Sequence, residues 1–187
     1  MFFFSKKSGI IFKEVRHLRI IITGFKPFMS HDVNPTEEII SILPGQIYGN
    51  EIIRLLLPVE FDNSFDVLKE AIIKYKPNVV IALGLAGNRK AISLERVAIN
   101  VDHSTAPDNI GNTPNHKTII KSGKNAYFSK LPLDEIVLKL KQKNINVEIS
   151  NTAGTYVCNN LFYHLMNYIE ENNLNIKAGF VHVPLMD

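Results

Sequence analysis

The chain has 187 residues, a hydrophobic fraction of 45 % and a net charge of +3 with its histidines neutral, which suits one globular domain with a sizeable core. Its basic residues are spread along the sequence without aromatic partners, which argues against nucleic acid as a partner. Its single cysteine excludes an intrachain disulfide, and no segment has the apolar length of a membrane span. We therefore expect a soluble, cytoplasmic protein.

Apolar segments typical of strands alternate along the chain with segments whose apolar residues recur at helical spacing. The strand-like segments are 18–25, 51–59, 78–87, 92–100, 145–150 and 178–184. The helical segments are 36–43, 64–75, 133–143 and 156–171, and the first has Thr36 as its expected N-cap. A long polar loop with prolines and glycines fills 101–118. This alternation predicts an α/β fold, a three-layer α/β/α sandwich around a largely parallel, mixed and twisted sheet.

Cys158 stands where an expected strand gives way to the helix 156–171. Apolar residues at helical spacing after it place its side chain on the buried face, and a free cysteine there is often ordinary core filling. In the first turn of a helix, however, outward-pointing amides and the helix dipole stabilise a thiolate and lower the pKa of the thiol. The same amides can receive the oxyanion that forms when a thiolate attacks a carbonyl. Spacing alone favours core filling, whereas the position at the helix start favours a reactive thiolate.

A thiolate nucleophile needs an imidazole, and the imidazole needs a group that orients it. His182 lies near the end of the last strand, where catalytic groups of α/β sheets collect, although a histidine at such a position, taken by itself, is more often a hydrogen-bonded core residue. His164 is expected in solvent, on the side of its helix opposite Cys158. Glu95 interrupts an apolar extended segment, and it points inward if it shares a face with the apolar residues that follow it. Spacing cannot show that these groups meet, and no metal-ligand spacing occurs.

Several motifs occur in a fixed order along residues 18–187. They are "TGFKPF" with "NP" after it, "LPVEF", "GLAGNR", "LERVAIN", "PDNIGNTP", "AGTYVCNNLFY" and "GFVHVP". Together they resemble the pyroglutamyl peptidase I family of cytosolic cysteine peptidases. The resemblance implies removal of an N-terminal pyroglutamyl residue from peptides, without metal or cofactor, by an enzyme that commonly assembles as a homotetramer.

The resemblance also implies a role for particular residues of this chain. The catalytic triad of the family falls on Cys158, His182 and Glu95, the three residues that the chemistry of the sequence favours. The substrate-binding positions fall on Phe25, Phe28, Leu85 and Val157. The two phenylalanines would hold the lactam ring, and the backbone around Leu85 would contact the ring amide. Without the resemblance, the phenylalanines read as anchors of a loop to the core.

Departures from the family pattern shape the remaining expectations. An arginine that supports the oxyanion site in the family falls on Thr105, and an aspartate falls on His116. The family continues beyond the position of Asp187, so we expect a single catalytic domain, 18–187, that is truncated at its C-terminus. Residues 1–17 are expected to form a poorly ordered extension. The alternative functions are a weakly active or inactive relative that only binds pyroglutamyl peptides or partners, and another small-molecule hydrolase on the same scaffold.

Overall fold

The structure, a computed structural model, describes residues 17–28 and 33–185. Within these residues, the middle layer is a seven-stranded sheet with the order β2-β3-β1-β4-β9-β5-β8. Its strands are β1 (Arg19–Phe25), β2 (Gln46–Ile47), β3 (Asn50–Leu57), β4 (Val79–Leu85), β5 (Ile92–Glu95), β8 (Val147–Ser150) and β9 (Lys177–Val183). Strands β3, β1, β4 and β9 run parallel, whereas β5 is antiparallel to β9 and β2 is antiparallel to β3. The prediction of a largely parallel, mixed sheet is confirmed.

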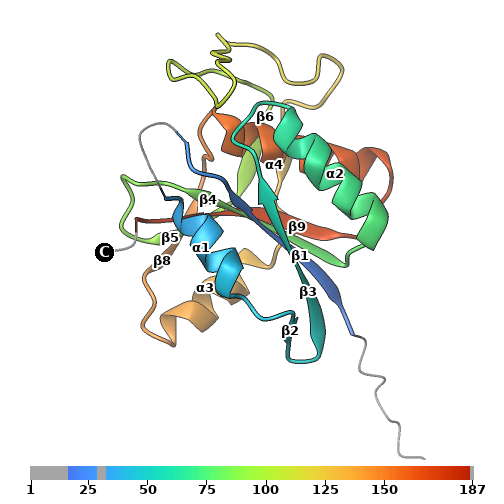
Figure 1. Cartoon of the computed structure of the whole chain (residues 1–187), viewed down its shortest axis with the longest axis vertical. Coiled ribbons are helices and arrows are strands. Elements are labelled where there is room, and N and C mark those ends of the chain that lie inside the picture. Colours follow the sequence, from blue (N-terminus) through green and yellow to red (C-terminus); the bar gives the residue numbers. More distant parts are fainter. Residues whose placement is uncertain (1–16, 29–32, 186–187) are drawn as a thin grey trace, which may run out of the picture.

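Helices cover both faces of this sheet (Figure 1). They are α1 (Pro35–Ile42), α2 (Asn63–Tyr75), α3 (Leu133–Lys141) and α4 (Val157–Glu171). Alternate residues of β4 face opposite sides, as the pleat of a strand requires. Val80 and Ala82 join the core beneath α2 and α4, whereas Ile81 and Leu83 join the core beneath α1 and α3. The three-layer α/β/α architecture is therefore confirmed.

The segment 92–100, expected to be extended, is broken at Arg96. Before the break, β5 belongs to the main sheet; after it, β6 (Val97–Ile99) pairs with β7 (Ala126–Phe128) in a separate two-stranded sheet. Glu95 does point inward and is 0 % exposed, while Arg96 is exposed and donates to Asn151. Both parts of the segment are extended, as expected, but they belong to two sheets because the chain leaves the main sheet directly after Glu95.

The start of α1 fixes the end of β1. Asn34 caps the helix by accepting the Thr36 amide at 3.0 Å and the Thr36 hydroxyl at 2.9 Å, and Pro35 takes the first helical position. The predicted cap, Thr36, is therefore wrong. The Thr36 hydroxyl accepts the Phe25 amide at 2.8 Å instead, and this bond ties the last residue of β1 to the helix.

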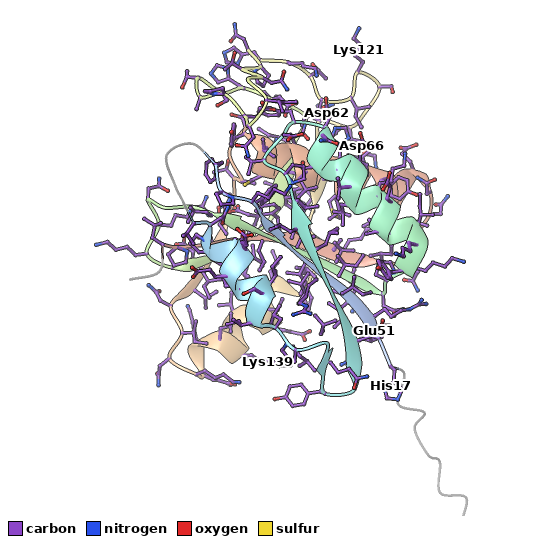
Figure 2. The ribbon with its side chains drawn as sticks, in the orientation of Figure 1. His17, Glu51, Asp62, Asp66, Lys121 and Lys139 are labelled. Carbon is purple, nitrogen blue, oxygen red and sulfur yellow. The ribbon has the colours of Figure 1, made fainter. Side chains whose placement is uncertain are left out.

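The expected N-terminal extension, 1–17, lies outside the described residues apart from His17 (Figure 2). The Nδ1 atom of His17 lies 2.7 Å from the carbonyl oxygen of Gly49, at the turn between β2 and β3. Among the described residues, no helix combines the length and the apolar character that crossing a membrane requires.

Candidate active site

A narrow, mostly apolar pocket lies at the carboxyl ends of β1 and β4, beside the start of α4. It is lined by Phe25, Phe28, Asn34, Val59, Leu85, Tyr156, Val157 and Cys158. Along the sheet, β3 adds to one side of β1, whereas β9, β5 and β8 add beyond β4. Ligands of α/β sheets bind at such a change of direction. The pocket gathers the four predicted substrate-binding residues and the cysteine, and it adds Asn34, Val59 and Tyr156, which sequence reasoning missed.

Cys158 is the second residue of α4 and is half-buried. The N-cap residue, Tyr156, makes no capping hydrogen bond through its side chain, and first-turn amides are available to a ligand at such an end. Strand β4 passes so close that a Cβ atom on Gly84 would lie 2.9 Å from Cys158 Sγ and 2.7 Å from Phe180 Cζ. Glycine at this position therefore leaves room for the sulfur atom of Cys158.

His182 lies one residue before the end of β9 and is 5 % exposed. Its Nδ1 atom is 2.7 Å from Glu95 Oε1 and donates to that carboxylate. The sulfur of Cys158 also acts on the His182 imidazole, through hydrogen bonding and charge. Burial by itself lowers the pKa of His182, but the hydrogen bonds and charges of Cys158 and Glu95 outweigh burial and raise the pKa to about 9. The structure thus brings the three predicted residues together in series, with a protonated imidazole in the middle.

Arg89, which sequence reasoning did not single out, completes the surroundings of the buried carboxylate. Its Nη1 atom is 2.6 Å from Glu95 Oε1, and its Nη2 atom donates to the carbonyl of Thr152 at 3.0 Å. Arg89 and His182 therefore share one oxygen of Glu95, and the other, Oε2, has no hydrogen-bond partner among the described residues. A buried carboxylate needs positive partners. In the sequence, the arginine of "GLAGNR", six residues before Glu95, was the residue that could have been predicted as such a partner.

The prediction that His164 lies in solvent is wrong. Its ring stacks on Phe65 with 5.2 Å between the centroids, and its Nε2 atom lies 3.1 Å from Asp62 Oδ1. Phe65 belongs to α2, and α2 packs against the side of α4 that carries His164. The sequence of α4 alone does not show that α2 packs against this side of it.

The loop 101–118 carries two of the departures from the family pattern, Thr105 and His116. Thr105 is exposed, and the ring of His116 stacks on His103 with 4.0 Å between the centroids. The loop is joined to the candidate pocket by the Tyr156 hydroxyl, which donates to the carbonyl of Pro107 at 2.9 Å. Over the described residues, no three His, Cys, Asp or Glu side chains are grouped to hold a metal ion.

A thiol at a helix start, an imidazole and a buried carboxylate in series form the arrangement with which cysteine hydrolases activate their nucleophile. On this fold, the site is that of an α/β cysteine hydrolase. The sequence model of the pyroglutamyl peptidase family matches residues 18–187. The chain belongs to this family.

Relatives and solved structures agree with that assignment. The chain is 47 % identical over 167 residues to the pyrrolidone-carboxylate peptidase of Brachyspira hyodysenteriae, and the match covers 89 % of this chain and 83 % of that protein. Pyroglutamyl peptidase I from Bacillus amyloliquefaciens superposes with a TM-score of 0.89 at 41 % identity, covering 91 % of this chain and 82 % of that one. A mutant pyrrolidone carboxyl peptidase from Pyrococcus furiosus gives 0.87 at 36 % identity, covering 90 % and 82 %.

Proposed function

We propose that this chain is a cysteine peptidase that removes N-terminal pyroglutamyl residues from peptides. The observation that carries the proposal is the series Cys158, His182 and Glu95 beside a small apolar pocket. Membership of the pyroglutamyl peptidase family supports it. In this proposal, Cys158 is the nucleophile, His182 is the general acid and base, and Glu95 orients the imidazole.

The reaction proceeds in two steps. The Cys158 thiolate attacks the carbonyl carbon of the pyroglutamyl residue, and amides at the start of α4 receive the oxyanion. His182 gives its proton to the leaving amine as the C–N bond breaks, which leaves a thioester. His182 then takes a proton from water, whose oxygen attacks the thioester; the C–S bond breaks, pyroglutamate leaves and the Cys158 thiolate is restored beside the protonated His182. Throughout, Glu95 accepts the Nδ1 hydrogen of His182 and so keeps Nε2 directed at the reacting atoms.

The pocket suits a neutral ring. Phe25, Phe28, Leu85 and Val157 line it, and its described lining residues carry no charge besides the cysteine. A lactam has no charge to desolvate, whereas the free ammonium of an ordinary N-terminus would be costly to bury between these side chains. The same walls that accept the pyroglutamyl ring therefore exclude unmodified N-termini.

The test is the release of a chromogenic amine from a pyroglutamyl amide. Wild-type protein is expected to turn over the amide, and Cys158→Ser and His182→Ala are expected to lose turnover. The matched control is His164→Ala, which should keep turnover. His164 is also a histidine, but it lies on α4 and contacts Asp62 and Phe65. Folded wild-type protein with no turnover above Cys158→Ser refutes the proposal; pyroglutamyl peptide binding without cleavage would then indicate the inactive relative.

We further propose that the protein works in the cytoplasm as a homotetramer. The resemblance to a family of cytosolic, commonly tetrameric enzymes supports this, and a single cysteine is typical of reducing compartments. Light scattering coupled to size-exclusion chromatography should give four times the mass of the 21.1 kDa chain; the mass of one chain would contradict it.

A further inference from the structure

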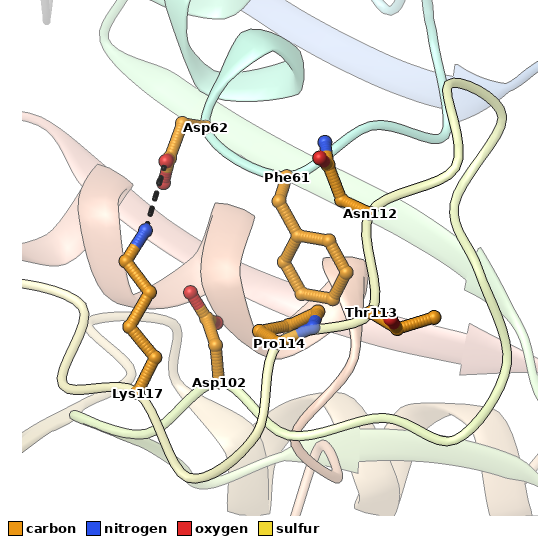
Figure 3. A pocket seen from close by; sticks show the side chains of 7 residues that line it. All are labelled: Phe61, Asp62, Asp102, Asn112, Thr113, Pro114 and Lys117. Atoms are coloured by element: carbon orange, nitrogen blue, oxygen red, sulfur yellow. Dashed lines mark ion pairs between the residues drawn. The ribbon is translucent and has the colours of Figure 1, made fainter.

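A second cavity, of about 310 Å³, lies between loop 101–118 and the start of α2 (Figure 3). Phe61, Asp62, Asp102, Thr113 and Lys117 are among its lining residues, and none of its lining residues lines the candidate active-site pocket. The proposed peptidase reaction uses none of these side chains. Two carboxylates in a cavity outside the active site need their own explanation.

Asp102 is the most constrained of these residues. Its backbone pairs with that of Lys117 through two hydrogen bonds, of 2.7 and 2.8 Å, and its side chain is held where the residue is 1 % exposed. Oδ2 accepts a hydrogen bond from the side-chain amide of Asn160 at 2.9 Å, but Oδ1 is buried with no hydrogen-bond partner among the described residues. A buried carboxylate oxygen without a donor is costly and rare. Asp102 lines the cavity, and because a carboxylate oxygen only accepts, a group that enters and binds this side chain has to donate.

The charges around the cavity favour a cation. Asp62 is held ionised because hydrogen bonds from His164 and Asn160, together with the Lys117 ammonium at 3.6 Å, keep its pKa well below the usual range in spite of partial burial. Burial raises the pKa of Asp102 to about 6 against the hydrogen bond from Asn160, so Asp102 is also ionised at pH 7. Lys117 therefore faces two negative charges, and the described residues that line the cavity carry a net charge of −1.

The kind of cation follows from the walls. The described residues give no third acidic or histidine ligand for a metal ion, and the Lys117 ammonium lies beside the carboxylates. Phe61 supplies an aromatic wall, on which organic cations bind well. We propose that this cavity binds an ammonium or guanidinium group, which donates hydrogen bonds to Oδ1 of Asp102 and competes with Lys117 for Asp62.

Two aromatic side chains in contact join the cavity to the candidate active site. The ring of Phe61 contacts the ring of Tyr156 edge-on, with 5.4 Å between the centroids, and Tyr156 lines the active-site pocket. The cationic group can therefore come from a free amine or from a basic side chain in the peptide that follows the pyroglutamyl ring. The second source rests on the proposed function, whereas the first does not.

The first experiment measures binding without turnover. Propylguanidine and propylamine are titrated into the full chain, and the melting temperature is followed. Wild-type protein should show a saturable rise, which Asp102→Asn weakens about tenfold or more in apparent affinity, as expected for a charge-assisted hydrogen bond. Asp66→Asn, an exposed acid nearby on α2 (Figure 2), is the matched control and should behave as wild type.

A second variant keeps the test independent of the folding of Asp102→Asn. Lys117→Met removes the competing ammonium and should tighten binding of propylguanidine, whereas Lys121→Met, in an exposed lysine of the same region (Figure 2), should not. A purely structural lysine would give no tightening. Absence of a saturable shift in wild type, or an equal shift in Asp102→Asn, overturns the proposal.

The source of the group is then decided with pyroglutamyl peptides. Arginine or norleucine is placed at the first, second or third position after the ring, and KM is measured for each pair. A lower KM for arginine at one position, lost in Asp102→Asn, assigns the cavity to the substrate. Equal KM values together with saturable binding of propylguanidine assign it to a free amine.

Discussion

Replacing Arg89 by methionine tests how the buried carboxylate is held. The Arg89 side chain is 23 % exposed and that of Glu95 is 0 % exposed, so the change leaves a buried charge with His182 as its remaining charged partner. Breaking a fully buried pair costs about 3–5 kcal/mol. Because Arg89 is partly solvated, we expect Arg89→Met to lower the free energy of unfolding by about 2–3 kcal/mol. For a chain of this size, that loss lowers the melting temperature by about 4–12 °C.

The assay is thermal unfolding of Arg89→Met beside Arg96→Met. Arg96 is exposed and donates to Asn151, so its loss should cost less than about 1 kcal/mol. Activity gives a second reading: without the arginine charge, Glu95 holds the His182 proton more strongly. The pKa of His182 then rises further, and the alkaline limb of kcat/KM moves to higher pH. Equal melting temperatures for the two variants, with unchanged pH profiles, would refute the reasoning.

Three further predictions concern the candidate active site. Gly84→Ala places a methyl group against Cys158 Sγ and should lower kcat by about tenfold or more with the fold retained, as far-ultraviolet circular dichroism can check. Tyr156→Phe removes the hydrogen bond to Pro107 and should cost about 0.5–1.5 kcal/mol of unfolding free energy; an unchanged value contradicts that link. His182 has a raised pKa, so its contribution to stability is complete below about 6.5 and is lost as the pH rises through about 9; this loss, of up to about 3 kcal/mol, should be absent in His182→Asn.

Local patterns carried much of the prediction. The continuous apolar run around Val80 and the helical spacing after Cys158 reported burial directly, because both depend on residues that are near neighbours in the chain. The break at Arg96 escaped detection, because an extended segment has the same alternation whether it stays in one sheet or passes into a second. The cap at Asn34 escaped detection because Pro35 permits two helix starts, and the bond between the Thr36 hydroxyl and the end of β1 decides between them.

The sequence by itself determined the α/β/α class and the place of Cys158 at a helix start. Each of these follows from apolar periodicity, which a chain carries locally. Tertiary structure alone decided that His182 meets Glu95 across 87 residues of chain, that Arg89 shares their oxygen, and that Asp102 is buried without a donor for Oδ1. Those contacts depend on which strands become neighbours, and strand order is set by the packing of the whole sheet.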